Sequence, residues 1–151
     1  HLRKALEEAP PLLEKAEGPR EGFRLEEVTL PDWRPVREGR MEGKVLSEKG
    51  ERAEGFFRLW EKGEKRLVLC LFLFPSEDEA KDYLEEVMGK LRGLSVEPLP
   101  EGGHFEAVEM GGVLWRKKET VFLLLLGKGE KGEVLGYLEL LPENLRPSRF
   151  F

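Results

Sequence analysis

One histidine in the middle of the chain has a neighbour with which it could do chemistry. His104 and Glu106 are two residues apart in a stretch with strand pattern, so their side chains are expected on the same face of a sheet. Such a pair could begin a metal site or act as an acid–base pair. A lasting metal site generally needs three or four ligands, and the only other histidine is His1. We therefore interpret His104 as a histidine beside a surface carboxylate, and we predict neither a metal nor a cofactor.

The segment 127–132, Gly-Lys-Gly-Glu-Lys-Gly, matches the pattern G-x-G-x-x-G of dinucleotide-binding loops. It follows an apolar run and precedes a segment that could be helical, which is the setting such a loop requires. A dinucleotide site also needs a further parallel strand and an acidic residue about 20 positions later, to hold the ribose. The residues after 132 offer neither, so we expect this segment to be a charged connector.

The remaining nucleophiles and carboxylates do not form a recognisable catalytic set. Cys70 lies inside an apolar run and is expected to be buried, where a thiolate is disfavoured. None of the serines lies in a nucleophile-elbow motif. Four acidic residues could supply paired carboxylates, but the chain has 30 Asp and Glu residues, so such clusters arise by chance. These four are Glu97, Glu101, Glu106 and Glu109. No catalytic residue is predicted.

Two tryptophans occupy matching positions in two similar stretches of the chain, a similarity that we call the internal echo. Each follows a leucine, precedes a charged turn, and is followed by an apolar run, either Leu67–Phe74 or Val121–Leu126. If the echo is a true duplication, a pseudo-twofold axis relates the two indoles, which could line one groove with neighbouring cations. The competing interpretation is that both indoles pack in the core. The candidate ligand-binding residues are Trp60, Trp115, Arg58 and Arg116.

Charge patterning argues against a polyanionic or membrane partner. The net charge is -5, and basic residues alternate with glutamates along most of the chain. Nucleic acid and anionic membrane surfaces require a basic stripe instead. No apolar run approaches the roughly 20 residues of a membrane-spanning helix. We therefore expect a protein or small-molecule partner, no nucleic acid and no membrane span.

The pattern of apolar residues predicts an α+β domain. We expect a single twisted, mostly antiparallel sheet of about seven strands with helices packed on one face, built from two strand-strand-strand-helix (βββα) units. The runs Leu67–Phe74 and Val121–Leu126 are apolar on both faces, so they should be central strands covered on both sides. Ser76 and Glu79 form a capping box that begins an amphipathic helix. Residues 133–141 fit both a helix and a strand, and the analogy with the first unit favours a helix.

The N-terminal residues and the compartment are less constrained. Residues 1–22 are expected to form a helical arm, interrupted at Pro10-Pro11, before a single domain over 23–151. His1 is either left from a cleaved tag or marks a start downstream of the native one. The second case would suit an extracytoplasmic domain, so extracytoplasmic and cytoplasmic locations both stay open.

Three functional hypotheses follow from these observations. The leading one is a non-catalytic binding or interaction module of a thermophilic bacterium. The composition, with no Ile, no Gln, a single Asn and many charges, is typical of thermophiles. The second is a small enzyme or small-molecule-binding protein whose pocket lies between sheet and helix and uses His104. The third is a structural subunit of a homo-oligomer, such as a homodimer, in which a second copy buries Val121–Leu126.

Overall fold

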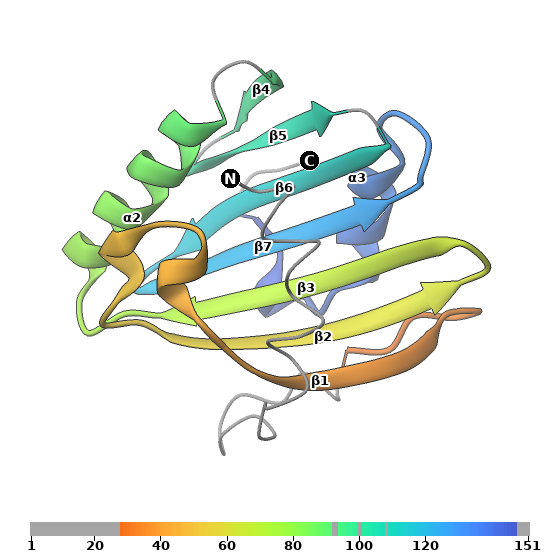
Figure 1. The fold of residues 1–151 in the computed structure, drawn as a ribbon, viewed down its shortest axis with the longest axis horizontal. Helices are drawn as coiled ribbons and strands as arrows, with labels where there is room; N and C mark the ends of the chain where they lie inside the picture. Colours follow the sequence, from red (N-terminus) through yellow and green to blue (C-terminus); the bar gives the residue numbers. More distant parts are fainter. Residues whose placement is uncertain (1–27, 92–93, 100, 108, 148–151) are drawn as a thin grey trace.

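The chain folds around one antiparallel sheet of seven strands, in the order β1-β2-β3-β7-β6-β5-β4 (Figure 1). The computed structural model describes residues 28–91, 94–99, 101–107 and 109–147. The predicted helical arm over residues 1–22 lies outside these ranges. The strands are β1 (Arg34–Glu42), β2 (Glu54–Lys62), β3 (Lys65–Leu73), β4 (Ser95–Leu99), β5 (Gly102–Ala107), β6 (Met110–Lys117) and β7 (Thr120–Gly127). The predicted α+β class and antiparallel sheet are confirmed.

One α-helix follows β3 and another follows β7, and two 3-10 turns lie between β1 and β2. The α-helices are α2 (Glu77–Lys90) and α3 (Glu133–Tyr137), and the 3-10 turns are η2 (Gly43–Val45), η3 (Glu48–Gly50), η4 (Leu138–Leu140) and η5 (Glu143–Leu145). The ambiguous segment 133–141 is therefore helical, as predicted. None of the helices among the described residues is both long and apolar enough to cross a membrane.

The long helix α2 forms for the reasons that its sequence indicates. The Ser76 hydroxyl accepts a hydrogen bond from the Glu79 amide at 3.2 Å, which is the N-cap half of the predicted capping box, and it donates to the Glu79 carboxylate at 3.3 Å. Ala80, Tyr83 and Val87, spaced three and four residues apart, are buried against the sheet.

Two separate apolar cores lie on the two faces of the sheet. The first core joins α2 to side chains such as Phe57, Cys70 and Leu123. The second core joins residues 28–33 and 133–145 to the alternating side chains of the same strands. β3 and β7 lie at the centre of the sheet and are buried on both faces, as predicted for runs that are apolar throughout.

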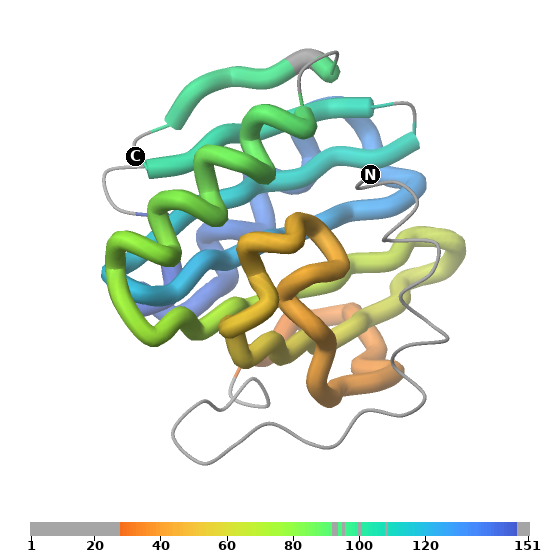
Figure 2. The backbone as a smooth tube through the Cα atoms, turned by 60° about the vertical axis from the view of Figure 1, so that its left-hand side comes forward, coloured from red at the N-terminus to blue at the C-terminus, as the bar shows by residue number. Residues whose placement is uncertain are grey.

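The prediction that the helices share one face is wrong for α3. Its side chains Val134 and Leu138 belong to the second core, whereas those of α2 belong to the first. Figure 2 shows α2 in front of the sheet and the C-terminal segment behind it. The physical reason is that both faces of β3 and β7 are apolar, and one helix can cover only one of them.

The internal echo has a counterpart in strand register. Leu59 pairs with Val68 in the β2–β3 hairpin, and Leu114 pairs with Leu123, at the same shift in sequence, in the β6–β7 hairpin. The element order β1-β2-β3-α2 is repeated as β5-β6-β7-α3, with β4 added at the edge. The two hairpins are therefore geometrically equivalent, while their origin by duplication stays a prediction.

Candidate functional site

The structure places both tryptophans in the second core. Trp115 stacks on Phe122 with ring centroids 5.2 Å apart, and its indole N–H donates to the Leu145 carbonyl at 2.8 Å. Trp60 is buried on the same face and lies under the guanidinium of Arg58, 5.5 Å from its ring centroid. The two indoles thus share a face, as the echo predicts, but they are packed inside and do not line an open groove.

Arg116 lies on the opposite face, and its guanidinium already donates hydrogen bonds to acceptors of the protein. Its guanidinium donates to Glu101 Oε2 at 2.6 and 3.0 Å, to Glu77 Oε1 at 2.9 Å and to the Lys118 carbonyl at 2.8 Å. Burial by itself lowers the pKa of Arg116, but the hydrogen bonds and charges of Glu101 and Glu77 raise it more. The net pKa shift is therefore upward. This arrangement, which we call the Arg116 clasp, joins the start of α2 to β6 and to the β4–β5 turn.

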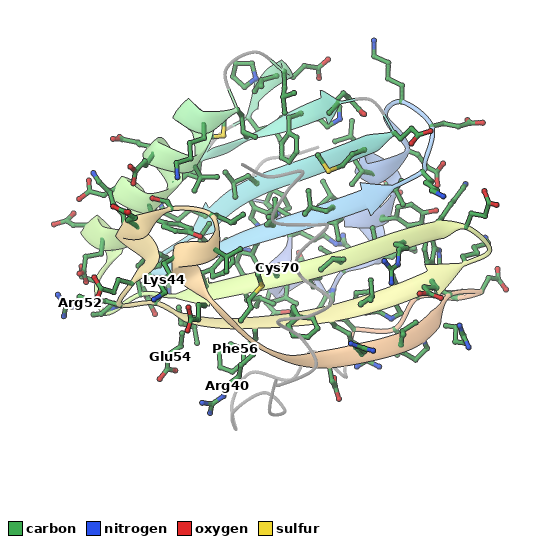
Figure 3. The ribbon with its side chains drawn as sticks, viewed as in Figure 1. Arg40, Lys44, Arg52, Glu54, Phe56 and Cys70 are labelled. Atoms are coloured by element: carbon green, nitrogen blue, oxygen red, sulfur yellow. The ribbon has the colours of Figure 1, made fainter. Side chains whose placement is uncertain are left out.

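Arg58 has a second arginine beside it that sequence reasoning did not identify. Arg40 pairs with Phe56 and Glu38 pairs with Arg58 across β1 and β2, so the two arginines occupy diagonal positions on one face. Figure 3 shows Arg40 and Phe56 projecting from the same side of these strands. We call Arg40 and Arg58 the arginine pair. The alternation of Glu38 and Arg40 along β1 is the signal that could have identified it.

The arginine pair holds donors that lack acceptors. Arg58 Nε, Arg58 Nη1 and Arg40 Nε are buried, and no group in the described part of the chain forms a hydrogen bond with them. Glu38 approaches Arg58 Nη1 only to 3.5 Å, which is the range of an ion pair and too long for a good hydrogen bond. The four predicted ligand-binding residues thus lie on both faces, and their role in binding stays a prediction.

His104 and Glu106 do meet on one face, the same face as the arginine pair but toward the opposite edge of the sheet. His104 Nε2 lies 2.8 Å from Glu106 Oε1, which also accepts a hydrogen bond from the Gly132 amide at 2.7 Å. Glu97, which pairs with His104 across β4 and β5, places its carboxylate 3.6 Å from Nδ1. Glu97 and Gly132 could not be assigned to this group from the sequence, because strand pairing brings Glu97 there and the return of the chain at α3 brings Gly132.

The segment 127–132 is a connector, as predicted, and its amides are taken by carboxylates of the chain. Gly132 donates to Glu106, and Glu130 donates to Glu133 Oε1 at 3.1 Å. Glu133 also accepts from Lys65 Nζ at 3.0 Å and from the Tyr137 hydroxyl at 2.9 Å. Burial by itself raises the pKa of Glu133. These hydrogen bonds and the Lys65 charge lower the pKa by more than burial raises it, so the net shift is downward.

Cys70 and Tyr83 lie in the first core. Burial raises the pKa of the Cys70 thiol to about 12, which leaves almost no thiolate at neutral pH. The Tyr83 hydroxyl donates to the Gly43 carbonyl at 2.7 Å and so ties α2 to η2. Among the described residues, no group of three or more His, Cys, Asp and Glu side chains is arranged to hold a metal ion.

Comparison with known proteins identifies the fold and no family. No family model and no curated protein matches the chain. The extracellular domain of PknH from Mycobacterium tuberculosis is similar in structure, with a TM-score of 0.54 and 10% identity, over 76% of this chain and 88% of that one. A GTP binding regulator from Thermotoga maritima has a TM-score of 0.53 and 20% identity, over 82% of this chain and 89% of that one. At these identities the likeness shows a shared fold alone.

Proposed function

We propose that this protein is a non-catalytic binding module whose ligand presents an anionic group, a carboxylate or a phosphate, to the arginine pair. The observation that carries the proposal is the set of three buried guanidinium nitrogens without hydrogen-bond acceptors in the described residues. Buried donors are almost always satisfied in folded proteins, so each exception calls for an acceptor such as an ion or water.

The cost of leaving these donors unpaired favours the binding of an acceptor from outside the chain. A buried donor left without a partner costs about 1–3 kcal/mol, and more when it is charged. Glu38 offsets part of the charge of Arg58 but satisfies none of these nitrogens with a good hydrogen bond. The planar guanidinium matches the geometry of carboxylate and phosphate oxygens, which can accept two hydrogen bonds in parallel.

The surroundings of Arg58 hold it ready for such a ligand. The ring of Trp60 packs against the guanidinium, which fixes its plane and leaves the nitrogens at its rim free to donate. Both arginines project from paired strands, which are more rigid than loops. A site with little freedom to lose binds its ligand at a smaller entropic cost.

The other polar groups support a binding role over catalysis. Arg116, Glu133 and Glu106 hold separate elements together through contacts with protein groups. The names of the two similar structures, an extracellular domain and a GTP binding regulator, are compatible with a binding or regulatory role. The third hypothesis loses its basis, because Val121–Leu126 is buried within a single chain. The oligomeric state itself stays a prediction.

The test measures stabilisation by simple anions. Thermal unfolding is followed at constant ionic strength with added phosphate or citrate and with chloride as the reference salt. At ten times its dissociation constant, a ligand adds about 1.4 kcal/mol of stability, which raises Tm by about 3–6 °C in a chain of this size. Methionine is the replacement in each variant, because it keeps most of the aliphatic stem.

Arg58→Met and Arg40→Met should each remove this rise. Arg34→Met is the matched control, because Arg34 lies on the same strand β1 but is exposed and paired with Glu61 at 3.2 Å. Equal anion-induced shifts in all four proteins would mean that the effect is a general salt effect. If phosphate and citrate do not raise the Tm of the wild type, the proposal is likewise contradicted.

A further inference from the structure

The imidazole of His104 has one nitrogen whose partner is missing. The His104 side chain is 7% exposed, and its Nδ1 atom is buried without a hydrogen-bond partner in the ranges that the structure describes. The nearest carboxylate oxygen, Glu97 Oε2, is 3.6 Å away, which is too long for a hydrogen bond. A buried ring nitrogen beside a carboxylate, and bonded to nothing, points to a third atom between them.

The second ring nitrogen faces a hydrogen-bond acceptor. Nε2 lies 2.8 Å from Glu106 Oε1, and an ionised carboxylate only accepts hydrogen bonds. A neutral imidazole in this arrangement carries its proton on Nε2, which leaves the lone pair on Nδ1. A histidine that binds a metal through one nitrogen and donates its other N–H to a carboxylate is the usual arrangement around protein-bound zinc.

Glu106 is itself held in place, so the orientation of His104 is fixed. Its Oε1 atom accepts a hydrogen bond from the Gly132 amide at 2.7 Å. Gly111 provides the space for this carboxylate, because a Cβ atom at position 111 would lie 2.9 Å from Glu106 Oε2. Any larger residue at position 111 would displace the carboxylate.

We propose that His104 Nδ1 and the Glu97 carboxylate bind a divalent transition metal of the zinc class at the β4–β5 edge of the sheet. Zinc binds histidine nitrogen at about 2.0–2.1 Å and carboxylate oxygen at about 2.0–2.2 Å. At a tetrahedral angle those bonds place the two ligand atoms about 3.4 Å apart, close to the observed 3.6 Å. Glu106 is a positioning residue, which acts on the metal through His104.

The site is open rather than closed. Glu97 is 75% exposed, and the described residues supply no third His, Cys, Asp or Glu to the group. The remaining coordination positions are therefore left to water or to a donor from a ligand. Structural zinc sites are usually closed by four protein ligands and catalytic sites use three, whereas the described part of this chain supplies two. We expect the metal here to be exchangeable and removable by a chelator.

This site is independent of the arginine pair. Arg58 and His104 belong to one lateral row of paired residues, with Leu69, Leu124 and Val113 between them. Four strand spacings separate the two residues, about 19 Å at the usual distance between neighbouring strands. Loss of one site therefore does not imply loss of the other.

The test is calorimetric titration of the chelator-treated full chain with zinc chloride. We expect one zinc per chain. Glu97→Gln and His104→Gln should each weaken binding at least tenfold, and Glu106→Gln should weaken it by about 10- to 100-fold. Glu109→Gln, which changes an exposed carboxylate in the turn after β5, is the matched control. His1→Ala is the second control, and both controls should bind within twofold of the wild type.

A second measurement does not depend on the stability of a histidine variant. In a long-range nitrogen–proton spectrum of the wild type, zinc should shift the Nδ1 resonance of His104 while Nε2 keeps its proton. The proposal is overturned if no zinc binds up to 1 mM, if Glu97→Gln binds as the wild type does, or if Nε2 is the nitrogen that shifts. Glu97 is largely exposed, so its variant should fold normally.

Discussion

Replacement of Arg116 by methionine tests whether the Arg116 clasp is structural. The Arg116 side chain is 6% exposed, and its guanidinium contacts two carboxylates and a carbonyl from three separate parts of the chain. Methionine keeps most of the apolar stem and removes the charge and every donor. The change therefore isolates the polar contacts from the packing.

The size of the effect can be estimated from the exposure of each partner. The side chains of Glu77 and Glu101 are 53% and 52% exposed, so solvent screens both ion pairs and each contributes at most about 1 kcal/mol. The charge-assisted bond to the Lys118 carbonyl adds about 1.5 kcal/mol. We expect Arg116→Met to lower the free energy of unfolding by about 2–3 kcal/mol, and Tm by about 4–12 °C.

Urea denaturation of the wild type, Arg116→Met and Arg116→Lys measures this loss. Lysine keeps the charge but not the planar fork, so its stability should lie between the other two. A double-mutant cycle with Glu101→Gln should give a coupling energy of about 0.5–1 kcal/mol. As a control, Arg66→Met removes an exposed pair with Glu61 and should change stability by less than about 0.5 kcal/mol. If Arg116→Met is as stable as the wild type, the clasp is not structural and Arg116 becomes available as a ligand-binding residue.

Three further predictions concern Glu133, Cys70 and the two hairpin turns. The pKa of Glu133 is lowered in the folded state, so its contribution to stability is complete above its unfolded pKa of about 4.3 and is lost as the pH falls through the lower folded value. The difference in unfolding free energy between the wild type and Glu133→Gln should thus be constant near pH 7 and disappear in acid; a difference that persists at pH 2 contradicts the assignment. Because burial raises the pKa of Cys70 to about 12, a thiol reagent at pH 8 should label it only in denaturant, and rapid labelling of the native chain would contradict its burial. Gly63 and Lys118 have φ values of 61° and 54°, so Gly63→Ala should destabilise by about 1 kcal/mol and Lys118→Gly should stabilise by up to about 1 kcal/mol. Chemical denaturation measures both, and shifts of the same sign would contradict the equivalence of the turns.

The sheet could be predicted from the sequence because its signals are local. The runs of β3 and β7 are apolar on both faces, which requires a central position whatever the rest of the chain does. The N-cap at Ser76 and the spacing of the apolar residues after it are likewise contained within one helix. These elements depend on neighbours in sequence, and they were predicted correctly.

The face that α3 covers could not be predicted, because no local signal carries it. Val134 and Leu138 are four residues apart and form one apolar stripe, but such a stripe packs on either face of an apolar sheet. The analogy with the first unit correctly predicts a helix here, but the expectation that both helices share one face is wrong. Long-range packing decides the position, since α2 and the η2–η3 turn already cover the first face.

The candidate sites show the same division between local and long-range signals. His104 and Glu106 were placed together by the alternation of a single strand, and they do meet. Glu97 and Gly132 join them through strand pairing and through the return of the chain at α3, neither of which is visible in composition. Arg116 was grouped with Arg58 by the echo, but the pleat of β6 turns it to the opposite face.

The two proposed sites lie where the apolar cover of the second face ends. Leu69, Leu124 and Val113 fill the middle of the lateral row and are fully buried, whereas Arg58 and His104 flank them on either side. A polar group at such a margin loses part of its hydration without gaining a partner inside the protein, which favours an external acceptor or metal. Because the strands between them form one hydrogen-bonded sheet, the separation of about 19 Å is fixed. A ligand that engages both sites must therefore span that distance, while a single phosphate or metal ion can occupy only one.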